Sequence, residues 1–354
     1  MKKSIILCGL ACSLSAFSQA TWQKLSASQS TDHGLSYSLP KTKLVVDVEY
    51  TKTTLKAGPY FRYAQNLLGI GNSILEDSET YLLDKITVTP TSVVDKTSAC
   101  MVQFKSALPY IILSPEGVLS AVNTQPDTTF LTQVPPLPRN SVVEKALENP
   151  QLAQSEETLA SGSIGKMAEQ AAKQIFRIRE SRTELLTGEA DNAPKDGAGL
   201  KLLMEQMDLQ ERRLTALFAG TIQKEKMYKR ISFVPGNDDL NRFVLFRFSK
   251  YFGFVNADDL SGEPVYIDLK ATDRKTFAPE PKKKSKEKPG LAYNISGRGQ
   301  LTVSFRSQNL YQEELPFTQF GIQANFPAEL FSNKKAPAKV VLNPQTGAIV
   351  RMMP

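Results

Sequence analysis

The hydrophobic pattern of this 354-residue chain changes period twice, and this change limits the folds that the chain can adopt. Apolar residues recur at helical spacing over residues 164–186 and again over residues 200–218. A loop at residues 189–199 separates the two blocks, and Gly188 before it is a natural helix stop. Because strand patterns occupy both flanks, we predict an α+β fold with an antiparallel α-helical hairpin between β-rich units.

Short strands are predicted on both sides of the hairpin, since the apolar runs there are brief and end at turn residues. On the N-terminal side a short helix is expected over residues 60–68, and strands are expected at residues 44–50, 81–88, 99–105, 110–113 and 118–122. On the C-terminal side strand patterns return after Tyr228, with the clearest strands at residues 301–305, 320–326, 339–342 and 348–352.

The two β-rich regions resemble each other in sequence. The stretches 69–84 and 253–268 carry Asn, Glu and Asp at the same positions. Three shorter matches keep the same chain order: residues 61–64 with 246–249, 102–106 with 303–307, and 113–115 with 342–344. We therefore predict an internal duplication, in which two related β-rich units flank the hairpin.

This organisation divides the chain into consecutive segments. They are a signal peptide at residues 1–20, an N-terminal β-rich unit at 21–140, the helical hairpin at 141–226, and a C-terminal β-rich unit at 227–354 with a lysine-rich loop at 279–290.

The N-terminus has the pattern of a secretory signal. Lys2 and Lys3 precede an apolar stretch at residues 4–14, which is too short to span a bilayer as an anchor. Cleavage after Ser18 and cleavage after Ala20 both fit the small residues that follow. Lipidation at Cys12 is disfavoured, because the usual aliphatic residue three positions upstream is missing. We expect export to the periplasm or the cell envelope, without a transmembrane helix in the mature chain.

The net charge of +7 does not indicate a basic binding face. Removal of Lys2 and Lys3 leaves 41 basic and 36 acidic residues, or +5. Residues 279–289 hold five Lys and two Glu, so this loop carries +3 of the remainder. Nucleic-acid binding normally needs aromatic interleaving or a basic helix face as well. We predict no nucleic-acid partner, although a salt-sensitive contact of the lysine-rich loop with an anionic surface remains an alternative.

Few residues offer catalytic or metal-binding chemistry. His33 is the single histidine, and Cys100 is the one cysteine outside the signal peptide, so His/Cys zinc sites and intrachain disulfides are excluded. The run Ser161–Lys166 lacks both the nucleophile-elbow and the phosphate-loop spacing. Paired carboxylates remain open, because the chain holds 36 acidic residues. We predict no catalytic residue, cofactor or metal ligand.

Two groups of residues are candidates for an interaction surface. The first group is the aromatic–arginine pairs Phe61–Arg62 and Phe246–Arg247, which the duplication makes equivalent. Such pairs occur in interface anchors, and they also occur as core rings with the arginine stem packed beside them.

The second group lies in the hairpin. Arg179 and Arg182 share a helix face, which we expect to be a solvated charged surface with pairing inside the helix. The alternative is that Arg182 and Glu184 tie the helix end to the loop that follows. Glu189 and Asp191 belong to that loop. We would test this loop first as a protein-facing surface.

Three sequence blocks resemble a known family. They are Pro40–Thr42 with Gly58–Ala64, Arg177–Arg182 with Leu186–Asp191, and Glu211 with Leu217–Gly220. Together they are similar to a family of exported Bacteroidales proteins described only as a domain of unknown function. The resemblance covers nearly all of the mature chain and implies export from a Gram-negative host. It implies no catalytic residue, cofactor or substrate.

From these observations we expect a non-enzymatic periplasmic or surface-associated binding or assembly module, whose partner is a protein or an envelope component. The alternative is a carboxylate-dependent hydrolase acting on envelope or dietary glycan. That alternative requires a cleft with two opposed carboxylates roughly 5–10 Å apart.

Overall fold

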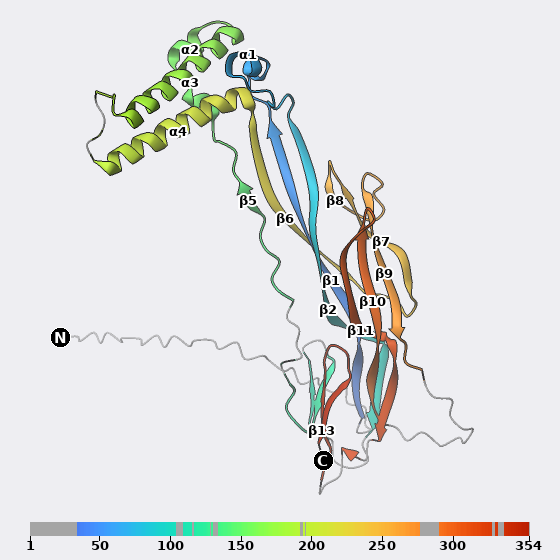
Figure 1. The fold of residues 1–354 in the computed structure, drawn as a ribbon. Helices are drawn as coiled ribbons and strands as arrows, with labels where there is room; N and C mark the ends of the chain where they lie inside the picture. Colours follow the sequence, from blue (N-terminus) through green and yellow to red (C-terminus); the bar gives the residue numbers. More distant parts are fainter. Residues whose placement is uncertain are drawn as a thin grey trace, which may run out of the picture.

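The computed structural model describes residues 34–103, 109–114, 117–127, 129, 134–191, 194, 196–276, 290–327, 330–331 and 336–353. Over these residues the chain is elongated, with helices at one end and the C-terminus at the other (Figure 1). The predicted signal peptide, His33 and residues 279–289 of the lysine-rich loop lie outside the described residues.

The described residues combine helices with antiparallel strands, which confirms a mixed α+β composition. The helices are η1 (Phe61–Tyr63), α1 (Ala64–Leu68), η3 (Pro150–Ala153), α2 (Glu156–Ala160), α3 (Ile164–Thr187) and α4 (Gly197–Ala219). The strands are β1 (Gly34–Lys56), β2 (Ser78–Gln103), β3 (Ile111–Leu113), β4 (Leu119–Val122), β5 (Ser141–Glu144), β6 (Thr221–Phe233), β7 (Leu240–Ser249), β8 (Gly253–Val255), β9 (Glu263–Asp273), β10 (Gly290–Phe305), β11 (Gln308–Pro327), β12 (Lys339–Leu342) and β13 (Ile349–Met353).

These strands form three sheets, which we name by their position. The stalk sheet has the order β2-β1-β6-β5, the body sheet β11-β10-β9-β7-β8, and the end sheet β13-β12-β4-β3. Residues of the stalk and body sheets share one core, in which Val46 and Val48 of β1 meet Phe246, Ile267 and other body-sheet residues. The stalk and body sheets therefore pack face to face.

Strand β1 contributes to two of the three cores of the molecule, and the segment that follows it enters the third. Its first half contributes Tyr37 and Leu39 to the end-sheet core, and its second half contributes Leu44 to Tyr50 to the core between stalk and body sheets. Tyr60, just beyond its end, lies in the core of the helical end. At about 3.3 Å per residue the strand spans roughly 75 Å.

Strand β2 differs from the prediction, because residues 81–88 and 99–105 were expected to form separate strands. The structure shows one strand over Ser78–Gln103, paired with β1 on both sides of Pro90, while residues 104 and 105 of the second predicted strand lie outside the described residues. Proline cannot donate a ladder hydrogen bond, but β2 is the edge strand of its sheet and so tolerates it.

Strand β6 begins at Thr221, earlier than the expected return of strand pattern after Tyr228. Strand β6 follows α4 directly, with Gly220 between them, and it pairs with β1 from Lys56 to Leu44. The unit boundary predicted at residue 226 falls inside this strand, and the stalk sheet draws strands from all three predicted units. The division into units stays a prediction.

The predicted repeat shows both likeness and difference in the structure. Gly69 and Gly253 share a left-handed backbone, with φ of 69° and 71°. Glu79 and Glu263 each lie at the start of a strand. However, residues 61–63 form a 3₁₀ turn, whereas residues 246–248 lie in strand β7. The duplication stays a prediction.

Local signals explain the ends of the two long helices. The Ser163 side chain accepts a hydrogen bond from the Lys166 amide at the start of α3, and Asp196 accepts one from the Gly199 amide at the start of α4. Helix α3 ends at Gly188, which adopts a left-handed backbone as the sequence predicts.

Candidate functional site

The two aromatic–arginine pairs lie in different parts of the fold. Phe61 is half-buried in η1 at the helical end, and the exposed Arg62 guanidinium lies 5.6 Å from its ring centroid. Phe246 is 1% exposed in the body-sheet core, where its ring stacks on Phe254 at 4.8 Å. The structure therefore does not join the two pairs into one surface.

Arg247 has a defined structural task. Its Nε donates to the Ala257 carbonyl at 2.9 Å, and its Nη1 donates to the Gly262 carbonyl at 3.1 Å. These bonds hold the loop between β8 and β9 against β7. Arg62 makes no comparable backbone contact among the described residues.

Arg179 and Arg182 join α3 to α4. Arg179 Nε lies 2.7 Å from Glu211 Oε1, and Arg182 Nη2 lies 2.7 Å from Glu211 Oε2. Both arginines therefore share one carboxylate on the neighbouring helix. Glu211 was not predicted as their partner, because residues 32 and 29 positions apart give no helical spacing signal.

Glu189 and Asp191 lie at the far end of α3, and both are exposed. The Glu189 amide donates to the Glu184 carbonyl at 2.9 Å, so the backbone of Glu189 closes the helix while its carboxylate faces solvent. Of the four candidates in this region, the arginines join the helices and the two acids stay at the tip.

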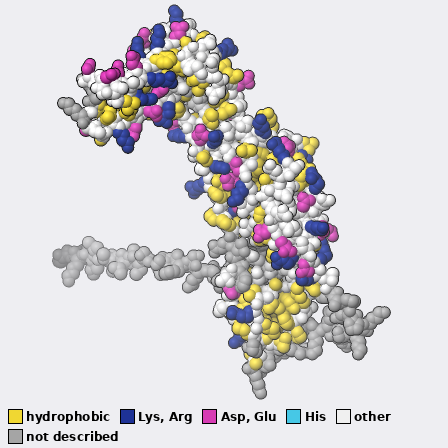
Figure 2. Space-filling view, viewed as in Figure 1, with side chains coloured by type: hydrophobic (Ala, Val, Ile, Leu, Met, Phe, Trp, Pro, Cys, Tyr) yellow, Lys and Arg dark blue, Asp and Glu magenta, His cyan; other side chains and the backbone are white. Residues whose placement is uncertain are grey.

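The outer halves of α3 and α4 form an exposed surface, which we call the helical arm (residues 176–187 and 197–211). No residue of the arm is buried, whereas the inner halves pack into a core through Ala168, Ala171 and Leu214. Four apolar side chains on the arm are exposed: Phe176 (49%), Leu186 (72%), Leu202 (58%) and Leu203 (36%). Figure 2 shows hydrophobic and charged side chains interspersed over the helical end.

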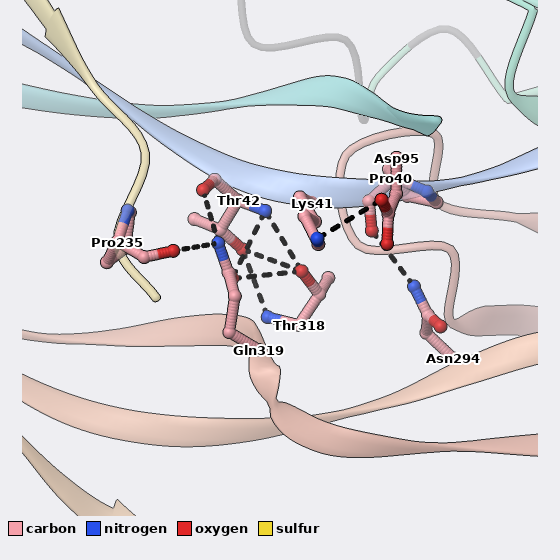
Figure 3. A network of polar contacts seen from close by, with 8 residues as sticks. All are labelled: Pro40, Lys41, Thr42, Asp95, Pro235, Asn294, Thr318 and Gln319. Carbon is pink, nitrogen blue, oxygen red and sulfur yellow. Dashed lines mark hydrogen bonds and ion pairs between the residues drawn. The ribbon is translucent and has the colours of Figure 1, made fainter. Parts of the chain in front are cut away.

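A second candidate region is the polar junction between β1 and β11 (Figure 3). β6 stops pairing with β1 at Leu44, so the next backbone groups of β1 need other partners. The Thr42 amide donates to Thr318 Oγ1 at 2.9 Å, and the Thr42 carbonyl accepts from Gln319 Nε2 at 2.7 Å. The same Gln319 amide group donates to the Pro235 carbonyl at 3.2 Å. The side chains of Thr318 and Gln319 thus bond the Thr42 backbone where β6 no longer pairs with β1.

Beside this junction lies a cleft of about 250 Å³. Lys41 Nζ and Asp95 Oδ1 form an ion pair at 3.1 Å on its wall, and Asp95 is only 8% exposed. The buried Asn294 side chain donates to the carbonyls of Pro40 and Thr346 at 3.2 and 3.0 Å. These contacts fasten β10 and the turn before β13 to β1, so the network is primarily a structural joint.

The described clefts offer little acid–base chemistry. Asp95 is the single carboxylate on the 250 Å³ cleft, and a cleft of about 260 Å³ near Gly58 is lined by no carboxylate. A third cleft carries Glu263 alone. None of these three clefts presents the opposed carboxylate pair that glycoside hydrolysis uses. Among the described residues, no group of three His, Cys, Asp or Glu side chains is placed to hold a metal ion.

The one cysteine in the described part of the chain is not activated. Burial raises the pKa of the Cys100 thiol above its ordinary value, although a hydrogen bond with Tyr37 opposes this effect. A raised pKa disfavours the nucleophilic thiolate. No described helix is long and apolar enough to cross a membrane.

The fold and these surfaces define an elongated α+β protein with an exposed helical arm at one end of a long antiparallel stalk. The chain belongs to the family described as "Domain of unknown function (DUF4831)", whose model matches residues 33–350. This confirms the resemblance to a domain of unknown function. No curated protein and no solved structure matches the chain.

Proposed function

We propose that the protein is a non-enzymatic binding or assembly module of the cell envelope, which holds a protein partner on the helical arm. The observation that carries the proposal is the exposure of Phe176, Leu186, Leu202 and Leu203 on paired helices that contain no buried residue over the same length. Large side chains of this kind, gathered on one projecting element, are typical of protein-binding surfaces.

The arm is also well suited to hold a partner, because its shape does not depend on that partner. Glu211 forms ion pairs with both Arg179 and Arg182, and it also accepts a hydrogen bond from Arg179 Nε, so these contacts keep the two helices together. A surface that is already ordered loses less conformational entropy on binding. The expected partner is a protein that offers an apolar groove to the leucines.

The site of action in this proposal is the periplasm or the cell surface. The basic start at Lys2 and Lys3 and the apolar stretch that follows support export. Fractionation of cells that carry the full chain, followed by N-terminal sequencing of the mature protein, tests this part separately. Recovery of the uncleaved chain from the cytoplasm would contradict it.

The partner is tested by cross-linking the full chain in its native envelope and identifying the captured proteins. We expect the double variant Leu186→Ser/Leu202→Ser to lose the partner that the wild type captures. Leu260→Ser is the matched control, because Leu260 is 80% exposed in a body-sheet loop. Capture of the same proteins by the double variant and the wild type would overturn the proposal. Equal thermal unfolding of all variants would show that the fold is intact.

A further inference from the structure

A separate cleft lies on the body sheet, and it is rich in hydrogen-bond donors. It has a volume of about 220 Å³ and is formed by β7, β9 and the turn between β10 and β11. Arg242, Arg306, Ser304 and Ser307 line it, together with Glu263 and Tyr266. No local sequence pattern predicts this group.

A β-bulge in β7 directs Arg242 toward this cleft. Leu240 pairs with Leu269 and Phe243 pairs with Ile267, so β7 has one more residue than β9 at this point. Asp268 Oδ1 accepts the Arg242 amide at 2.7 Å and stabilises the bulge. The Arg242 guanidinium then lies 4.0 Å from the centroid of the Tyr266 ring.

The Arg242 guanidinium is held by stacking alone. It forms no ion pair and no side-chain hydrogen bond with any residue that the structure describes. Stacking on a ring occupies the face of a guanidinium and leaves its N–H groups, which lie in the plane, free to donate. An arginine placed in this way can bind an oxyanion with two parallel hydrogen bonds.

The opposite wall of the cleft is a tight turn that another ion pair anchors. Arg306 Nε donates to Glu263 Oε2 at 2.8 Å, and Arg306 Nη2 donates to Glu263 Oε1 at 2.5 Å. This bidentate contact occupies the one carboxylate of the cleft. The Ser304 and Ser307 hydroxyls form no hydrogen bond with a described residue, so they are available to a ligand.

Several residues with left-handed backbone lie in the same place. Five described residues other than glycine have positive φ, and Asn123 and Asn149 are of a type that tolerates this conformation. The other three are Arg242 (φ 47°), Arg306 (φ 51°) and Ser307 (φ 69°), and all three line this cleft. At Arg306 and Ser307 the left-handed backbone is that of a two-residue hairpin turn between Phe305 and Gln308, whereas at Arg242 it belongs to the β-bulge.

We propose that this cleft binds an oxyanion, a phosphate or carboxylate group of a larger molecule, between the Arg242 guanidinium and the hydroxyls of Ser304 and Ser307. All unoccupied polar side-chain groups of the cleft can donate, and its one carboxylate is already paired with Arg306. The lining residues carry two positive charges and one negative charge. The site lies on the body sheet, so this inference does not depend on the helical arm.

The test is an NMR titration of the full mature chain with inorganic phosphate and, separately, with acetate. We expect saturable shifts of the Arg242 and Ser307 amide signals with at least one of the two anions. Binding of phosphate alone would indicate a phosphorylated ligand, and binding of acetate alone would indicate a carboxylate ligand. Absence of saturable shifts with both anions would overturn the proposal.

Arg242→Asn isolates the guanidinium, because asparagine tolerates the left-handed backbone at the bulge. We expect this variant to bind the anion about tenfold more weakly or worse, since a charge-assisted bidentate contact is lost. Arg298→Asn is the control for net charge, because Arg298 pairs with Glu314 outside the cleft. Unchanged affinity in Arg242→Asn would overturn the proposal, and so would an equal loss in Arg298→Asn. An unchanged spectrum elsewhere would show that Arg242→Asn is folded.

Discussion

Individual side chains form hydrogen bonds with backbone groups that no neighbouring strand pairs. The Tyr37 hydroxyl accepts the Ala292 amide at 2.6 Å and donates to the Ala292 carbonyl at 3.1 Å, which links β1 to β10. Thr318 and Gln319 do the same for the Thr42 backbone. Because an unpaired buried backbone group costs about 1–3 kcal/mol, these few residues help to hold strands β10 and β11 of the body sheet on β1.

Tyr37 makes the stability of the protein sensitive to high pH. Burial raises the pKa of Tyr37 well above its ordinary value of 10.0, and the neighbouring Cys100 adds to this effect. A raised pKa in the folded state means that this contribution to stability is complete below the unfolded pKa of about 10 and is lost as the pH rises above it. We expect Tyr37 to ionise only when the chain unfolds.

The measurement is an alkaline titration that follows tyrosinate absorbance and far-ultraviolet circular dichroism together. Tyr37 should ionise at the pH of unfolding, and Tyr37→Phe should reduce the amplitude of that step by one tyrosine without removing it, because burial also raises the pKa of Tyr50, Tyr60 and Tyr311. Ionisation of every tyrosine in a chain that keeps its native circular dichroism would contradict the prediction.

Gly58 allows the helical end to dock closely on the stalk. A Cβ at this position would lie 2.2 Å from the Leu217 carbonyl oxygen, which accepts the Tyr60 amide at 2.8 Å. We expect Gly58→Ala to lower the free energy of unfolding by about 1–3 kcal/mol, measured in urea. Gly236→Ala is the control, because its Cβ would meet no atom within 4 Å. Equal stability of the two variants would show that the contact can relax.

At the scale of elements, the helical arm depends on its ion pairs more than on a core. Glu211, whose side chain is 15% exposed, receives both Arg179 and Arg182. Glu211→Gln removes the charge that the two arginines share, and we expect a loss of about 1 kcal/mol. Hydrogen exchange of arm amides should then be about fivefold faster.

Glu205→Gln is the control for that experiment. Glu205 pairs with Lys201 at 3.9 Å within α4, and both side chains are largely exposed. Its loss should leave exchange in the arm unchanged. If both variants exchanged equally fast, the contact between the helices would not be what orders the arm.

The elements differ in how far they could be predicted. Helices α3 and α4 were predicted well, because helical periodicity, caps and Gly188 are local signals. Strand β2 was divided, because the tolerance of Pro90 depends on the edge position of the strand, which is a property of the assembled sheet.

No local sequence pattern predicts the contacts that join the sheets. Thr42 and Gln319 lie 277 positions apart, and their pairing arises only where β6 leaves β1. Arg242 was missed for a similar reason, because a β-bulge follows from strand register and not from residue type. The candidate residues found from sequence were those with local patterns, such as Arg179 and Arg182.

For the whole molecule, the main expectation is an extended shape in solution. Strand β1 alone spans roughly 75 Å, whereas a compact chain of this size has a radius of gyration of about 20 Å and therefore a diameter of only about 50 Å. Small-angle X-ray scattering of the mature chain should give a clearly larger value. A value near that of a compact sphere would mean that the helical end folds back onto the sheets.

Strand β1 joins two of the three cores and leads directly into the third, and this arrangement has a mechanical consequence. A partner that pulls on the helical arm, while the end sheet is held, would load β1 along its own axis. The β1–β2 and β1–β6 hydrogen bonds lie across that axis, so many of them share the load in shear and cannot break one at a time. Pulled in this direction, the stalk would resist extension strongly.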